Sequence, residues 1–170
     1  METWDAVRAR RNVRHFSDKP ISASDIDRIL EAGRRSPSAS NWQPWDFVVV
    51  TDRDLLGELA GVWKGAWHVA NAAAAITLVS PQAAIERQRI LYFDLGQATI
   101  TMMLVAADLG LATGHANVED QDLARRLLGF PADHFSPNMI SVGHPAEGTL
   151  RPLDTLDRRP FDEVVHRQTW

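Results

Sequence analysis

The sequence predicts an α+β fold in which a small mixed sheet is flanked by helices. Three short apolar runs, rich in Val and Ile, predict buried strands at positions 47–50, 74–79 and 139–142. Between these runs, apolar residues recur at the three- and four-residue spacing of helices. The chain has 170 residues, of which 45% are apolar. That length suffices for one core, so we expect a single domain over residues 1–170.

Two helices and a strand are expected in the first third of the chain. Residues 4–11 are predicted to form a short helix. The run Ser-Ala-Ser-Asp from Ser22 has the form of a capping box, and the apolar residues after it predict a second helix ending near Arg35. Pro37 ends that helix, because the residue before a proline disfavours the helical conformation. The strand at 47–50 follows.

The middle of the chain is expected to alternate helices with the second strand. That strand, at 74–79, stops at Pro81. Helices are predicted on either side of it, over 55–60 and over 82–109, the longer one broken near 87–91. The longer helix holds the most apolar part of the chain, but two aspartates and a glutamine interrupt it. This favours burial in the core or in a subunit interface over a membrane span.

The last third is expected to contain one helix, one strand and an extension. The helix over 123–128 is terminated by Gly129, and the strand at 139–142 ends at Gly143. Residues 143–170 are rich in Pro and Arg and show little core-forming pattern. They are therefore predicted to form a C-terminal extension that either lacks order or wraps over something.

The composition excludes several kinds of site. The chain has no cysteine, which rules out disulfides, thiolate catalysis and Cys-ligated zinc, and its six histidines show no zinc-ligand spacing. We therefore expect no metal. The net charge of −4 gives no reason to expect nucleic acid as a partner. The N-terminus lacks the basic-then-apolar order of a signal peptide, and together with the missing cysteines this leads us to expect a cytoplasmic protein.

A cluster of arginines near the N-terminus is the first candidate binding site. Arg10, Arg11 and Arg14 lie within five residues, with Asn12 between them. Guanidinium groups are planar, permanently charged and bidentate, which suits a phosphate ester. The alternative is a solvated arginine face on the first helix.

The second candidate is a polar, proline-bounded loop over residues 37–45, with the sequence Pro-Ser-Ala-Ser-Asn-Trp-Gln-Pro-Trp. Its amide and hydroxyl groups suit the hydrogen-bonding edge of a heterocycle. A simple turn between a helix and a strand is the alternative. Trp42 and Trp45 are expected chiefly to pack, and Gln43 to fix the shape of the loop. A phosphate site and a heterocycle site together predict a nucleotide-like cofactor.

This pair of motifs resembles the nitroreductase family, whose pattern is roughly Arg-Arg-Ser-x-Arg followed by Pro-Ser-x-x-Asn-x-Gln-Pro-Trp. Asn12 replaces the usual Ser here. The resemblance continues downstream at Leu109-Gly110-Leu111, at Gly143 to Glu147 and at Arg158-Arg159-Pro160, so it covers nearly the whole chain. It implies a nitroreductase-like sheet flanked by helices in an interlocked homodimer. The extension over 143–170 would wrap the partner, and FMN would bind at the interface.

The resemblance also implies roles for individual residues at the phosphate end of FMN. Arg10, Arg11 and Arg14 would contact the phosphate and ribityl chain, with Asn12 donating beside them. Arg158 occupies a position where relatives often place a second phosphate ligand. Two residues earlier, where relatives are often basic, this chain has Leu156.

At the ring end, the resemblance implies contacts from both subunits. The loop of the partner would pack on the flavin through Pro37 and Ala39 and make polar contacts through Ser38 and Asn41. The backbone N–H groups of Asn117 and Val118 would face flavin N5 and O4. The side chains of His115 and Trp42 are candidates for the substrate pocket. Asp94 is expected to cap a helix or to lie in the subunit interface.

The implied activity is ping-pong hydride transfer from NAD(P)H through flavin N5 to a small organic acceptor such as a nitroaromatic or quinone. No side chain is assigned a catalytic role, because the cofactor carries the chemistry. The short segment between Val79 and Asp94 implies an open pocket. Reductive dehalogenation, oxygen-dependent flavin breakdown and a deazaflavin cofactor are alternatives, as is a non-catalytic flavin-binding or redox-sensing module.

Overall fold

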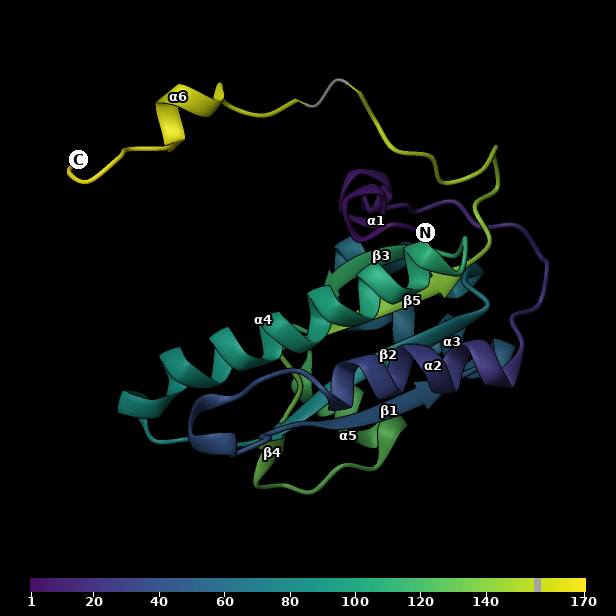
Figure 1. Ribbon diagram of the computed structural model, residues 1–170. Coiled ribbons are helices and arrows are strands. Elements are labelled where there is room, and N and C mark those ends of the chain that lie inside the picture. The colour runs from purple at the N-terminus through teal and green to yellow at the C-terminus, as the bar shows by residue number, and fades with distance from the viewer. Residues whose placement is uncertain (155–156) are drawn as a thin grey trace.

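The computed structural model describes residues 1–154 and 157–170 and forms three layers, a sheet with helices on both faces (Figure 1). The helices are α1 (Thr3–Ala9), α2 (Ala23–Arg34), α3 (Arg53–Leu59), α4 (Ile85–Asp108), α5 (Gln121–Leu128) and α6 (Phe161–Val164), with 3-10 segments η1 (Ala39–Asn41), η2 (Ala60–Val62) and η3 (Lys64–Asn71). The strands are β1 (Asp46–Val50), β2 (Ala74–Pro81), β3 (Ala112–Asn117), β4 (His134–Phe135) and β5 (Asn138–Gly143). The predicted α+β class is confirmed.

The strands are ordered β1-β2-β5-β3, and β4 pairs with the end of β2. All pairs between these strands are antiparallel, so the central strand β5 runs opposite to both β2 and β3. Within the described residues, parallel pairing is confined to a single bridge between Asn12 and Thr113. The prediction of a mixed sheet is therefore wrong for the pairing among the five strands. The one parallel bridge joins β3 to the arginine-bearing segment, at Asn12.

Two apolar layers hold the sheet. On one face, Ile76 of β2 and Ile140 of β5 pack with Ile29 of α2 and Met102 of α4, all without solvent exposure. Helices α2 and α4 lie in front of the sheet in Figure 1. On the other face, residues of β1, β2 and β5 pack against α3, η3 and α5. The site described below is built on the edge strand β3, which both layers support.

Most helix ends lie close to where capping and terminating residues in the sequence predicted them. The Ser22 hydroxyl accepts a hydrogen bond from the Asp25 N–H at 3.1 Å, so the predicted cap of α2 is confirmed. Gly129 closes α5 in the left-handed conformation, with φ of 73°. The predicted break near 87–91 is wrong, because α4 runs continuously from Ile85 to Asp108. Its first turns are polar but contain no glycine or proline that would interrupt a helix.

Helix α4 is long and apolar enough to cross a membrane by length and composition, but half of its most apolar stretch is buried inside the protein. Leu91, Leu95, Ala98 and Met102 pack on the sheet. Helix α4 is therefore a core helix, as predicted. Its outer side keeps exposed apolar residues: Ile90, Tyr92, Phe93 and Ile100.

The chain after β5 first follows α1 and then leaves the body of the molecule, as Figure 1 shows. Leu150 is buried, the Leu153 N–H donates to the Arg8 carbonyl at 3.3 Å, and Arg8 pairs with Asp154 at 2.5 Å. Every residue from 157 to 170 is exposed, including α6. The prediction about Leu156 lies outside the described residues.

Candidate functional site

The arginine-bearing segment lies along the outer edge of β3. The Val13 N–H donates to the Thr113 carbonyl at 2.8 Å, and the His115 N–H donates to Asn12 Oδ1 at 3.3 Å. Asn12 therefore acts as an edge partner of β3. No strand was predicted here, because residues 112–117 include few with strand preference.

This pairing shows which backbone groups of β3 remain on the free edge. Successive residues of an antiparallel strand direct their N–H and C=O groups to alternate sides. The backbone groups of Thr113 and His115 face the Asn12 segment. The backbone groups of Asn117 therefore face the same side of β3, beyond the end of that segment. The Val118 N–H already donates to the Pro137 carbonyl at 3.2 Å. Of the two backbone donors predicted to meet a ring, Asn117 is therefore the one on the open edge.

Arg10 and Arg14 carry charge that the described part of the chain does not neutralise. Neither forms an ion pair there. Arg11 differs, because its guanidinium donates to the Ala9 and Arg151 carbonyls at 2.9 and 3.3 Å. Arg11, Asn12 and Arg14 line a cavity of about 350 Å³ whose opposite wall is formed by the chain after β5, including Pro145 and Glu147.

Behind this cavity lies a buried hydrogen-bonded pair that the sequence did not indicate. His68 Nδ1 and Ser141 Oγ are 2.8 Å apart, and Ser141 Oγ donates to the Gly114 carbonyl at 3.2 Å. His68 is fully buried, and its Nε2 has no hydrogen-bond partner among the described residues. No spacing rule links residues 68 and 141, which meet because η3 packs against the sheet at β5.

Burial, together with the nearby charge of Arg14, lowers the pKa of His68 to about 4. Partial burial also lowers the pKa of His115. Both rings are therefore neutral at neutral pH. A neutral His68 adds no charge beneath the arginine cluster, so the positive charge of the cavity comes from the guanidinium groups.

The His68 environment predicts acid-sensitive folding. The unfolded chain binds a proton at His68 near pH 6.5, whereas the folded protein resists it until about pH 4. The stability that His68 contributes is therefore complete above pH 6.5 and falls as the pH decreases. We expect a loss of about 1–2 kcal/mol between pH 6.5 and 5, visible in urea unfolding. His68→Gln should flatten that slope and His166→Gln, on the exposed tail, should keep it. An unchanged slope in His68→Gln would contradict this origin.

The polar loop has a defined shape. Ser40, Asn41 and Gln43 have φ values of 53°, 56° and 54°, a conformation that costs energy for residues other than glycine. Ser38 Oγ accepts from the Gln43 N–H at 2.9 Å, and Gln43 Nε2 donates to the Asn41 carbonyl at 3.1 Å. Gln43 therefore fixes the loop as expected, and the Asn41 side chain stays exposed.

Asp94 connects this loop to α4. The carboxylate is almost fully buried, with Oδ2 accepting from the Ala39 N–H at 3.0 Å and Oδ1 accepting from Gln97 Nε2 at 3.3 Å. The expectation that Asp94 caps a helix is wrong, since α4 begins at Ile85 and Asp94 lies within it. Its role in this protomer is to hold the backbone of η1. The interface alternative for Asp94 stays a prediction.

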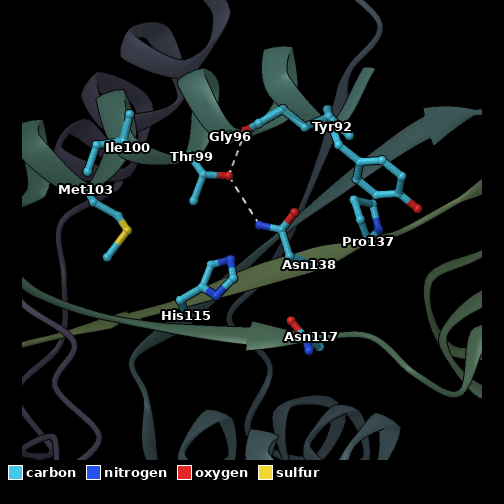
Figure 2. Close-up of a pocket in the computed structure, with 10 residues that line it drawn as sticks. Tyr92, Gly96, Thr99, Ile100, Met103, His115, Asn117, Pro137 and Asn138 are labelled. Carbon is cyan, nitrogen blue, oxygen red and sulfur yellow. Dashed lines mark hydrogen bonds between the residues drawn. The ribbon is translucent and has the colours of Figure 1, made fainter. Parts of the chain in front are cut away.

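A third group of polar side chains lies between α4 and the ends of β3 and β5, in a cavity of about 420 Å³ (Figure 2). His115 points into it from β3, and Asn138 Nδ2 donates to Thr99 Oγ1 at 3.2 Å. Met103 and Ile100 supply an apolar wall from α4. Thr99 and Asn138 were not anticipated, because no sequence pattern marks these two polar residues as buried.

The structure brings some of the predicted residues together and keeps others apart. Asn12 and His115 share a hydrogen bond at β3. The loop residues Pro37, Ser38 and Ala39 line a different cavity beside α4, and Trp42 lines a neighbouring one with Arg87. Arg158 lies on the exposed tail, where its guanidinium donates to the Asp157 carbonyl at 2.6 Å. One protomer therefore holds the predicted pieces at separate places.

Comparison with known proteins decides the family. A profile described as "Nitroreductase family" matches residues 7–88. A protein of Archaeoglobus fulgidus, provisionally named NADH dehydrogenase/NAD(P)H nitroreductase, is 31% identical over 174 residues, covering 99% of each chain. The chain belongs to the nitroreductase family. A 5,6-dimethylbenzimidazole synthase of Rhodospirillum rubrum is 30% identical over 88% of this chain and 83% of its own length.

Solved structures of nitroreductases show the same fold. An FMN-dependent nitroreductase of Clostridium difficile superposes with a TM-score of 0.84 at 24% identity, covering 97% of this chain and 98% of its own. An NADPH:FMN oxidoreductase of Vibrio harveyi superposes with a TM-score of 0.84 at 23% identity, covering 97% of this chain and 76% of its own. The recognition of a nitroreductase-like fold is confirmed, and so is the enzyme class, an FMN-dependent NAD(P)H oxidoreductase of the nitroreductase type.

Proposed function

We propose that this nitroreductase binds FMN between two copies of the chain and transfers hydride from NAD(P)H to a small organic acceptor. The observation that carries the proposal is the pair of unneutralised guanidinium groups, Arg10 and Arg14, beside a strand edge with a free backbone donor at Asn117. Positive charge suits the phosphate, and a directed N–H suits the edge of the ring.

The phosphate end fits the residues present. The cavity lined by Arg11, Asn12 and Arg14 has room for a phosphate and part of the ribityl chain at about 350 Å³. Charge-assisted hydrogen bonds from guanidinium groups would compensate for removing the phosphate from water. Glu147 on the opposite wall is exposed, so solvent screens its repulsion.

The ring end also fits. The Asn117 N–H on the free edge of β3 could donate to the ring without breaking an existing hydrogen bond, whereas Val118 could not. When bound, FMN would accept a hydride from NAD(P)H and pass reducing equivalents to the acceptor. The chain would orient the ring, with Asn12 holding β3 in register. His115, neutral at pH 7, would line the substrate side without adding charge.

A second protomer would complete the site. The loop at Pro37–Asn41 lies away from the arginine cluster of its own protomer and is held in a fixed shape, as expected of a segment that serves the partner. Exposed apolar residues of α4, among them Tyr92 and Ile100, would be covered by dimerisation. The tail from 157 onward leaves the body and would reach across the partner with Arg158.

The proposal is tested by the visible absorption spectrum of the purified protein under anaerobic conditions, with its mass measured by sedimentation. We expect a dimer with a bound-flavin spectrum that bleaches on adding NADH or NADPH. A flavin spectrum that neither nucleotide bleaches would instead indicate a binding or sensing module. A colourless monomer that takes up no added FMN would overturn the cofactor and dimer assignments together.

A further inference from the structure

Two arginines at the start of α4, Arg87 and Arg89, flank the polar loop and have been given no role so far. Arg89 lines a cavity of about 560 Å³ together with Pro37 and Ser38, and Arg87 lines an adjoining cavity of about 170 Å³ with Ser40 and Trp42. Ala39 and Ile90 contribute to both cavities, so the two form one continuous region beside the loop.

The Arg87 guanidinium is held in place by an aromatic ring. Its central carbon lies 5.8 Å from the centroid of the Trp42 ring, within the range of a cation–π contact. Such a contact occupies the face of the guanidinium and leaves its N–H edge free for an acceptor. Among the described residues, neither Arg87 nor Arg89 forms an ion pair.

Two acidic side chains lie near Arg87 and Arg89, but neither forms an ion pair with them. Asp94 also lines the cavity of Arg89, but its carboxylate is directed to the Ala39 N–H and Gln97 and forms no ion pair with either arginine, so one negative charge offsets the two positive charges only in part. Glu86 precedes Arg87 on the exposed first turn of α4 and forms no ion pair with the described residues. The N-terminal end of the α4 dipole adds further positive potential near Arg87.

The region also offers apolar surface of the right kind for a ring. Ile90 is 44% exposed and Phe93 is 68% exposed, and both line the cavity of Arg89. Exposed apolar surface next to two guanidinium groups is complementary to an aromatic ring that carries an anionic substituent.

We propose that Arg87 and Arg89 select an aromatic anion, such as an aryl carboxylate, as the electron acceptor. This rests on the proposed function, because the loop at Pro37–Asn41 would place the two arginines beside the flavin of the partner. Trp42 takes part as the residue that positions Arg87. The acceptor would lie against Ile90, with its charge on the guanidinium groups.

The test compares two acceptors that differ in charge, 4-nitrobenzoate and 4-nitrobenzamide. The protein is first reduced with dithionite, so that nucleotide binding plays no part, and flavin reoxidation is followed anaerobically. Each acceptor takes two electrons and two protons, giving the nitroso compound and water. We expect the double variant Arg87→Gln/Arg89→Gln to lose the preference for the carboxylate by about three- to thirtyfold, through a weaker apparent affinity. The double variant Arg87→Lys/Arg89→Lys should keep most of the preference for the carboxylate.

Matched controls make the outcome decisive. Arg126→Gln, at an exposed position on α5, should leave the preference unchanged. Benzoate and benzamide binding, measured by calorimetry, should show the same charge preference without turnover. An unchanged preference in the Arg87/Arg89 double Gln variant would overturn this inference while leaving the flavin chemistry intact. A change confined to NADPH over NADH in the reductive half-reaction would also overturn it, since the charge would then serve the donor.

Discussion

Replacing Gly114 with Ala is expected to separate the arginine segment from β3 and to weaken the proposed FMN binding. A Cβ at this position would lie 2.5 Å from the Val13 carbonyl, 2.7 Å from Ser141 Oγ and 2.9 Å from His68 Cε1. The first neighbour is backbone and cannot move without breaking the bond between Val13 and Thr113. We expect a loss of about 1–3 kcal/mol in stability, typical of overpacking, and at least a tenfold loss in FMN affinity.

Both quantities can be measured, by urea unfolding of the cofactor-free protein and by titration of flavin fluorescence. The matched control is Gly57→Ala on α3, where a Cβ would have no neighbour within 4 Å. In that exposed helical position Ala should be neutral or stabilising by about 0.5–1 kcal/mol, because it has the higher helix propensity. Wild-type FMN affinity in Gly114→Ala would show that contact between residues 13 and 114 is not needed for the site.

Arg14→Ala is expected to weaken FMN binding by about ten- to a hundredfold while leaving the free energy of unfolding nearly unchanged. Arg14 is exposed and contributes no ion pair within the described chain, so its removal breaks little in the cofactor-free protein. Arg11→Ala should differ, because Arg11 also donates to the Arg151 carbonyl and would release part of the C-terminal segment.

Calorimetric titration of FMN at two salt concentrations would check the Arg14 prediction. The affinity difference between wild type and Arg14→Ala should shrink at high salt, since screening weakens the phosphate contact. Arg126→Ala serves as the charge-matched control on a distant surface. If both variants lost affinity equally, the effect would reflect net charge and not a phosphate site at Arg14.

Several elements could be predicted because their signals are local. The cap at Ser22, the terminating Gly129 and the apolar runs of β1, β2 and β5 each depend on a few neighbouring residues. Strand β3 could not be found in this way. Its Ala-Thr-Gly-His-Ala-Asn sequence has little intrinsic strand preference, and it forms because β5 pairs on one side and Asn12 on the other.

The candidate site shows the same division. The types of residue that suit a phosphate, Arg10, Arg11 and Arg14, are visible in the sequence and in the family pattern. Their hydrogen-bond partners are not visible in the sequence. Only the structure shows that the Arg11 guanidinium donates to two carbonyl groups and that the Arg14 guanidinium does not. The His68–Ser141 pair depends on the approach of η3 to the sheet, which no pattern in the chain records.

The strand order also determines when this protein can fold during its synthesis. β5 is the central partner of both β2 and β3, yet it is the last of the sheet strands to leave the ribosome. A nascent chain that ends before Asn138 carries two strands with open edges, which favour association with other chains. The arginine segment, made first, has no stable strand to lie on until β5 has emerged. If the proposed FMN site is correct, the cofactor can therefore bind only after β5 has been synthesised.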